Sequence, residues 1–237
     1  MGTLYLVSTP IGNLEDITLR AKRILGEVDL IACEDTRKTG LLLKKLGISK
    51  KEFLSYYEEN ELQRIPQIIN LLKESKKIAL VSNAGIPTLS DPGFKLVRET
   101  LQAGIRVEAV PGASAALTAL VVSGLPTDKF LFLGFLPKKA GKRKKVLDSL
   151  PTKTTILFFE SPFRLLKTLN ELKTLFGEIE IVLCRELTKI HEEIRREKIS
   201  NSLTHFDKNR PKGEFTLLFR IPLKSKHHLE AGPVLSL

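Results

Sequence analysis

Residues 78–93 read IALVSNAGIPTLSDPG, an apolar run that passes directly into a loop rich in glycine and proline. Ile78–Ser82 predicts a short buried strand, and Ser82–Gly93 predicts an irregular loop. A helical pattern follows over Phe94–Ala103, and Gly104 stands directly after it, where glycine commonly ends a helix. A strand, a long loop and a helix in this order are typical of the α/β class.

The same alternation extends over most of the chain. Continuous apolar strands separated by amphipathic helices predict a parallel sheet that is covered on both faces, with a mixed sheet left open in the second half. Residues 60–63, NELQ, resemble a capping box. Further strands are expected at 3–8, 28–33, 105–110, 130–135, 154–159, 180–184 and 215–221, and further helices at 14–25, 38–46, 60–75, 142–150 and 163–175.

The alternation breaks at residues 123–129, where Gly124 and Pro126 interrupt the pattern. We therefore expect two α/β domains, residues 1–123 and residues 124–222. Residues 223–237 show no periodicity, and we expect them to form a disordered tail.

Basic residues are concentrated in the second half of the chain. The net charge is +11 overall, but residues 113–237 carry 22 lysines and arginines against 13 acids, while residues 1–112 carry 16 against 14. This asymmetry favours contact between the second half and a polyanion such as nucleic acid. A role in solubility is the alternative.

Several classes of protein are disfavoured. The apolar segment 113–122 is too short for a bilayer, which needs about 20 residues, so a cytosolic protein without membrane contact is expected. Cys33 and Cys184 lack CxxC spacing and are expected to be reduced core thiols. The four histidines lack ligand-like spacing, so no metal is expected. Neither a dinucleotide fingerprint nor a P-loop occurs.

Four loops rich in small residues each follow a predicted strand. They span residues 8–14, 34–37, 82–93 and 111–116. In an open α/β sheet ligands bind at the carboxyl ends of the strands, and glycine or alanine there leaves backbone groups accessible to a ligand. Ordinary turns are the alternative for any single loop.

With these loops the chain resembles the tetrapyrrole methylase superfamily over residues 3–221. Within it, the chain looks most like members that methylate the 2′-oxygen of a cytidine in the decoding region of 16S ribosomal RNA. The matching motifs are STPIGNLEDIT (8–18), CEDTR (33–37), SNAGIPTLSDPG (82–93), VPGASAALTAL (110–120), GFLPKKAGKR (134–143), FFESPFRL (158–165), RELTKIHEE (185–193) and KGEFTLL (212–218).

The resemblance implies a cofactor cleft between two α/β domains, S-adenosylmethionine as methyl donor, the small ribosomal subunit as partner, a homodimer and a cytoplasmic location. Asn83 and Ile86 depart from the family, which usually has Asp and Thr there, so donor affinity is the property we expect to differ. The residues carried over by position as donor-binding are Pro10, Ala84, Gly85, Ile86, Leu89, Ser114, Ala115, Phe159 and Gly213.

A ribose hydroxyl is a weak nucleophile, so a base that removes its proton should speed the transfer by about 100- to 10,000-fold. Asp35 and Glu160 stand at strand ends, and Lys189 and Glu192 lie in the RELTK segment, but Glu34 is the favoured base. The alternative is that Glu34 and Asp35 pair with Arg37 and shape their loop.

Cations suited to RNA phosphates occur singly and in a run. Guanidinium groups bind phosphate bidentately, so Arg37, Arg164 and Arg185 are candidates. The run is predicted to clamp the RNA backbone rather than to select a base, with a solvated helix face as the alternative. Its cations are Lys138, Lys139, Lys142, Arg143, Lys144 and Lys145.

Two other functions stay open. The first is methylation of a tetrapyrrole or of a diphthine precursor, although a compact acidic substrate does not call for cations spread over half of the chain. The second is a non-catalytic ribosome-binding protein that no longer binds the donor, which the departures at Asn83 and Ile86 suggest.

Overall fold

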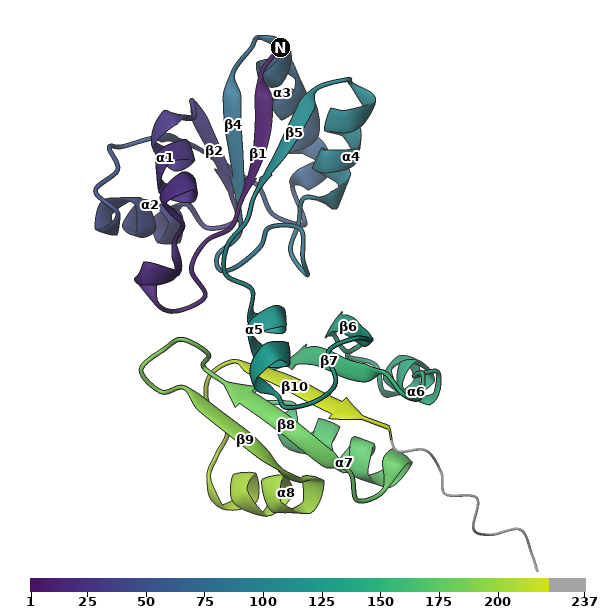
Figure 1. Cartoon of the computed structure of the whole chain (residues 1–237). Helices are drawn as coiled ribbons and strands as arrows, with labels where there is room; N and C mark the ends of the chain where they lie inside the picture. The colour runs from purple at the N-terminus through teal and green to yellow at the C-terminus, as the bar shows by residue number, and fades with distance from the viewer. Residues whose placement is uncertain (222–237) are drawn as a thin grey trace, which may run out of the picture.

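The computed structural model describes residues 1–221, which form two lobes, each built on a five-stranded sheet (Figure 1). The α/β class with two sheets that the sequence predicts is confirmed. Residue 222 and the predicted tail at residues 223–237 lie outside the described residues.

The first sheet is parallel throughout, with strand order β3-β2-β4-β1-β5. Ile24 and Leu43 pack in a core on one face, and Ile68 and Leu96 in a core on the other, which confirms a parallel sheet covered on both faces. Its strands are β1 (Thr3–Val7), β2 (Leu30–Cys33), β3 (Glu52–Ser55), β4 (Lys77–Val81) and β5 (Arg106–Val110).

Two pairs of helices cover this sheet, α1 with α2 on one face and α3 with α4 on the other (Figure 1). The expected helix at 14–25 is divided, because a 3₁₀ turn, η1 (Leu14–Asp16), precedes α1, whose first turn is capped by the Thr18 hydroxyl. The helices are α1 (Leu19–Glu27), α2 (Thr36–Lys45), α3 (Glu61–Lys73) and α4 (Phe94–Gln102).

The second sheet is mixed, which was the alternative left open for this half. Its order is β6-β7-β10-β8-β9, with β6 parallel to β7 and the remaining neighbours antiparallel. Helices α6 (Ala140–Asp148), α7 (Leu165–Phe176) and α8 (Ile199–Lys208) pack on one face. The strands are β6 (Phe130–Phe135), β7 (Thr155–Glu160), β8 (Glu180–Arg185), β9 (Glu193–Lys198) and β10 (Phe215–Arg220).

Helix α5 (Ala115–Val122) covers the other face of the second sheet, although it precedes the sequence break. Its buried Leu120 packs with Val182 of β8 and Leu218 of β10. The domain boundary at residues 123 and 124 stays a prediction, but this packing places α5 with the second lobe. We therefore propose that the boundary lies before α5.

Three sequence expectations concern local detail. The predicted capping box does not form, because the Asn60 side chain accepts a hydrogen bond from the Tyr57 N–H at 2.8 Å instead of capping α3. Cys33 and Cys184 are buried and free, as predicted. Across residues 1–221, no helix combines the length and the apolar character that crossing a membrane requires.

Candidate active site

A cavity of about 450 Å³ lies between the lobes, at the strand ends where the loops of both sheets meet. The first lobe contributes the loops after β1, β2, β4 and β5, and the second contributes the ends of β6, β7 and β8 with the start of β10. All of the strand-end loops predicted from the first half reach this cavity. Its walls are formed by Ile11, Glu34, residues 83–86, residues 89–91, Ser114, Ala115, Phe135, residues 159–162, Cys184, Leu187, Lys189 and residues 213–216.

Backbone hydrogen bonds and unusual backbone angles define the loop after β4. Thr9 and Gly85 exchange two backbone hydrogen bonds of 2.9 and 3.0 Å, which tie this loop to the one after β1. Thr88 and Ser90 have φ angles of 74° and 67°, in the left-handed region that costs energy for residues with a Cβ. Backbone strain of this kind gathers at ligand sites, where the surrounding structure maintains it.

The two lobes touch at two places, and glycine permits each contact. A Cβ on Gly12 would lie 2.5 Å from the Lys189 side chain, and the next residue, Asn13, donates its N–H to the Thr188 hydroxyl at 3.0 Å. At the second place, a Cβ on Gly134 would lie 2.8 Å from the Ser90 hydroxyl. A larger residue at Gly12 would therefore force the opposite loop to shift, and at Gly134 a φ of 60° disfavours any side chain.

Carboxylates and an amide line the first-lobe side of the cavity. The Asn83 side-chain amide donates to the Glu34 carboxylate at 2.8 Å, so the departure from the family at Asn83 gives Glu34 a neutral donor rather than a second negative charge. Asp91 stands beside them, and burial, with a further effect of the Glu34 charge, raises its pKa to about 6. The Ser82 hydroxyl offsets part of this rise.

A second cavity, of about 730 Å³, adjoins the first on the N-terminal lobe. Asp35 lies in its wall and caps α2, accepting from the N–H groups of Arg37 and Lys38 at 2.9 and 3.2 Å. The hydrogen bond from Lys38 is the main reason why the pKa of Asp35 is lowered. In the described part of the chain, neither Glu34 nor Asp35 forms an ion pair with the Arg37 guanidinium, although Asp35 does shape the loop.

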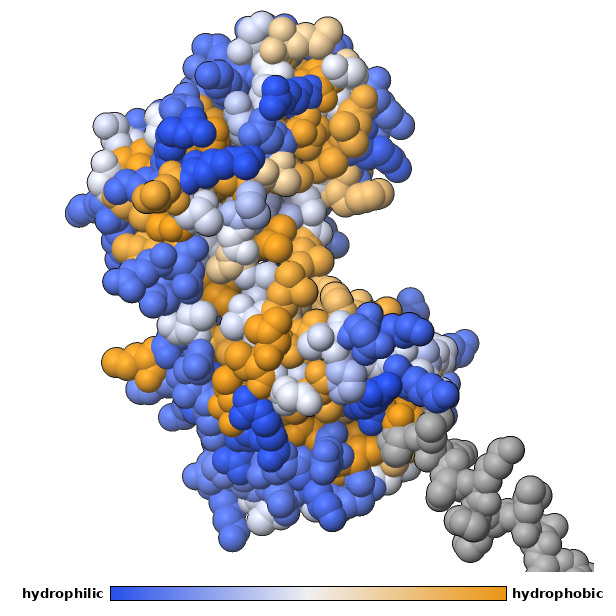
Figure 2. Space-filling view, in the orientation of Figure 1, coloured by the Kyte–Doolittle hydropathy of each residue, from blue (hydrophilic) through white to orange (hydrophobic). Residues whose placement is uncertain are grey.

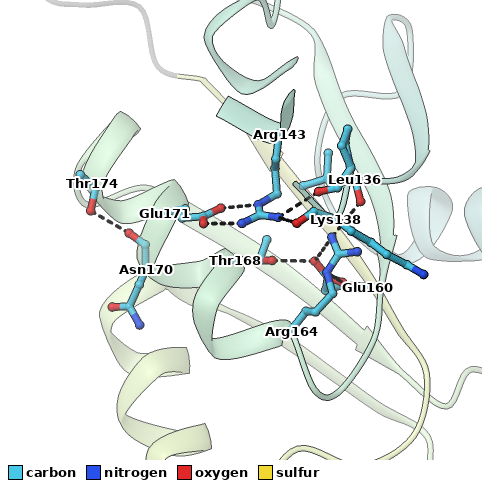
Figure 3. Close-up of polar contacts among 10 residues, drawn as sticks. Leu136, Lys138, Arg143, Glu160, Arg164, Thr168, Asn170, Glu171 and Thr174 are labelled. Atoms are coloured by element: carbon cyan, nitrogen blue, oxygen red, sulfur yellow. Dashed lines mark hydrogen bonds and ion pairs between the residues drawn. The ribbon is translucent and has the colours of Figure 1, made fainter. Parts of the chain in front are cut away.

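A buried polar network lies behind the second-lobe wall (Figure 3). Glu160 lines the cavity, yet its carboxylate accepts from the Thr168 hydroxyl at 2.6 Å and forms an ion pair with Arg164 at 3.1 Å. Because these contacts involve both carboxylate oxygens, we assign Glu160 a structural role rather than that of a base. Arg164, predicted to bind RNA, also donates to the Leu136 carbonyl at 2.8 Å.

The structure corrects the prediction for Arg143. The residue is 2% exposed, and its side chain forms two bonds of 2.5 and 2.6 Å with Glu171 on α7, as Figure 3 shows. Its remaining nitrogen donates to the Pro137 and Lys138 carbonyls, each at 2.9 Å. With all three side-chain nitrogens bonded inside the fold, Arg143 fastens α6 to α7 and does not reach RNA.

The other predicted RNA contacts differ in their surroundings. Arg37 is exposed in the wall of the second cavity. Arg185 is half-buried and bonded to the Lys212 carbonyl and Glu193. The lysines of the basic run are exposed on α6 and the loop before it, namely Lys138, Lys139, Lys142, Lys144 and Lys145.

The structure brings most of the predicted donor-binding residues to the cavity. Pro10 is displaced by one position, since Ile11 lines the wall instead. Lys189 lines the cavity and Glu192 does not. Sequence reasoning missed Asp91, although it lies within the quoted loop, and also Ser90 and Phe135. The predicted residues in the wall are Glu34, Ala84, Gly85, Ile86, Leu89, Ser114, Ala115, Phe159 and Gly213.

Comparison with known proteins agrees with this architecture. Residues 3–202 match the family model described as Tetrapyrrole (Corrin/Porphyrin) Methylases. A protein of Thermotoga maritima named ribosomal RNA small subunit methyltransferase I is 50% identical over 92% of this chain and 98% of its own length. A protein of Haemophilus influenzae with the same name is 47% identical over 98% of this chain and 83% of its own.

Solved structures show the same fold at low sequence identity. Uroporphyrin-III-C-methyltransferase from Thermus thermophilus aligns with a TM-score of 0.64 and 21% identity, covering 93% of each chain. Diphthine synthase aligns with a TM-score of 0.71 and 14% identity, covering 92% of this chain and 90% of its own. The chain belongs to the tetrapyrrole methylase family, and its similar relatives are methyltransferases.

Proposed function

We propose that this protein transfers a methyl group from S-adenosylmethionine to the ribose 2′-oxygen of a cytidine in the decoding region of 16S ribosomal RNA. The observation that carries the proposal is the cavity between the lobes, lined by accessible loop backbone and joined to a second, polar cavity. The printed name of the relatives supports ribosomal RNA as the substrate.

The residues in the cavity fit the proposed donor. Its volume of about 450 Å³ lies within the range of roughly 300–1,000 Å³ that small-molecule sites occupy. The Phe135 and Phe159 rings, 5.5 Å apart, offer an aromatic wall for adenine. When bound, the donor supplies a methyl group on sulfur that is open to nucleophilic attack.

Exposed lysines support RNA as the acceptor. The basic run on α6 and the loop before it has five lysines that remain exposed once Arg143 is set aside, and they lie on the lobe with the larger positive charge. Such contacts with phosphate set affinity and salt dependence, while the choice of one cytidine would come from the shape of the assembled subunit.

We further propose a homodimer, as the resemblance implies. Figure 2 shows an apolar band at the waist of the molecule, over the region where Figure 1 places α5. Leu117 and Val121 on this helix are 49% and 71% exposed. Apolar side chains exposed next to each other on one face of a helix are typical of a surface that a partner covers.

Calorimetry with S-adenosylmethionine separates this proposal from a non-catalytic ribosome-binding protein. We expect saturable binding with one donor per chain. Absence of binding, with and without small ribosomal subunits, would favour the non-catalytic alternative. Methylation of a tetrapyrrole or diphthine precursor in place of ribosomal RNA would favour the other family activities.

A further inference from the structure

Four residues belong to the walls of both cavities, namely Glu34, Asn83, Ser90 and Asp91. A methyl group passes between two bound molecules only where their sites meet, with the reacting atoms about 3–3.5 Å apart. If the donor occupies the first cavity, the shared wall is the place where an acceptor in the second cavity can approach it.

The remaining walls of the second cavity suit a nucleotide. Arg37 and Lys38 offer cations for phosphate, and the exposed ring of Tyr57 offers a surface on which a base can stack. We infer, on the basis of the proposed function, that the acceptor nucleotide occupies this second cavity and that Asp91 is the base for its 2′-hydroxyl.

Asp91 suits this role better than Glu34, the base favoured by the sequence. Glu34 is exposed, and its carboxylate is engaged by the Asn83 amide. Asp91 is half-buried and forms no ion pair with any residue between 1 and 221. Its pKa of about 6 lies just below neutral pH, where a base is both ionised and able to hold a proton.

Charged or hydrogen-bonding side chains around Asp91 come from four segments. Burial raises the pKa of Asp91 most, the charge of Glu34 after β2 raises it further, and Ser82 at the end of β4 lowers it. Arg37 and Lys38 at the start of α2 share the cavity wall, as do Glu58 and Glu59 before α3. Glu34 is therefore a positioning residue, whose charge keeps Asp91 a stronger base.

The step balances without a further reactant. A lone pair of the 2′-oxygen forms the new bond to the methyl carbon, and the electron pair of the broken carbon–sulfur bond stays on sulfur. The hydroxyl proton moves to the Asp91 carboxylate, which becomes a neutral acid and later releases the proton to water.

Single-turnover methylation of small ribosomal subunits between pH 5 and pH 8.5 tests this assignment. For the natural protein the rate should rise roughly tenfold per pH unit below about 6 and then level off. Asp91→Asn should keep donor affinity within about twofold and lower the plateau rate by about 100-fold or more. Glu34→Gln should keep most of the plateau and move the midpoint to lower pH.

Stability gives a readout that is independent of activity. The pKa of Asp91 is raised from its ordinary value of 3.8 to about 6 in the folded state. The free energy of unfolding therefore falls as the pH rises from the first value to the second, and stays lower above it. Asp91→Asn should therefore raise Tm at pH 7.5 and leave it unchanged near pH 4. Asp128→Asn, an exposed position before β6, is the matched control and should change neither rate nor Tm.

The outcomes distinguish this inference from the proposed function. Near-normal turnover of Asp91→Asn in an otherwise active protein would overturn the role of Asp91 alone. A Glu34→Gln plateau as low as that expected for Asp91→Asn would return the base to Glu34. Failure of the natural protein to bind donor or methylate subunits would instead refute the proposed function.

Discussion

Arg143 shows at the scale of one residue how burial changes the role of a cation. Arg143→Ala would leave Glu171 without its partner and free the Pro137 and Lys138 carbonyls. We expect the free energy of unfolding to fall by about 2–4 kcal/mol, measured by urea denaturation. Lys142→Ala, one residue away and exposed, should change it by less than about 0.5 kcal/mol. Equal losses in the two variants would contradict this role.

The same contact should be sensitive to acid. The hydrogen bonds from Arg143 are the main cause that lowers the pKa of Glu171 below its ordinary value of 4.5. A lowered pKa contributes stability above that value, which is lost as the pH falls through the folded-state pKa. The difference in Tm between the natural protein and Arg143→Ala should therefore narrow from pH 6 to pH 3. A difference in Tm that stays constant over this pH range would show that Glu171 remains ionised or that its charge does not contribute to stability.

Single residues of the site were predictable from sequence only where a loop motif contained them. Ala84, Gly85 and Ser114 lie in the cavity wall because their loops follow predicted strands. The environment of Asp91 was not predictable, since its burial and its neighbour Glu34 depend on two strands that meet in the folded sheet. Arg143 has the same limitation, because its partner is 28 residues away on another helix.

At the scale of an element, α6 should carry part of the affinity for RNA. Replacing Lys142, Lys144 and Lys145 by alanine, with Arg143 retained, removes up to three exposed cations without breaking the ion pair to Glu171. The slope of log affinity for small subunits against log salt should become shallower by up to about 2. The change should be measured by filter binding at several salt concentrations. An unchanged slope would remove α6 from the RNA contact.

Two of the elements that the sequence missed, β3 and β9, are edge strands. Strand β9 carries five charged residues in six, yet it pairs with β8 at the sheet edge, where ion pairs such as Arg195–Glu197 at 2.7 Å link its side chains. Strand β3, at the edge of the first sheet, is only four residues long. Edge strands are commonly short or charged, which limits pairing with other molecules. Central strands such as β4 were predictable because both of their faces are buried.

At the scale of the whole molecule, the exposed face of α5 should hold two copies together. Leu117→Glu combined with Val121→Glu would bury charge in that interface, at a cost of several kcal/mol. We expect the mass in solution, measured by light scattering, to fall from that of a dimer to that of a monomer. The control is Leu101→Glu, at an exposed apolar position on the distant α4. Thr118→Glu would be a poorer control, because Thr118 is part-buried beside Leu117 and Val121 on the same helix. A monomeric natural protein, or a variant that remains dimeric, would contradict this interface.

The relation between the lobes was the least predictable feature from sequence. Gly12 and Gly134 allow loops of opposite lobes to meet. The sequence around these glycines does not indicate that Lys189 and Ser90 are the residues they contact. The resemblance implied a cleft, and the structure places a cavity there with residues from both sheets. In the proposed function, that arrangement would bring a small donor and a large acceptor together.

Transfer of labelled methyl groups to small ribosomal subunits that lack the modification tests the proposed reaction. With the purified protein and labelled S-adenosylmethionine, followed by digestion and mass spectrometry of the 16S ribosomal RNA, we predict one added methyl group on the 2′-oxygen of one cytidine in the decoding region. A label on a base, on scattered riboses, or on no RNA at all would contradict it.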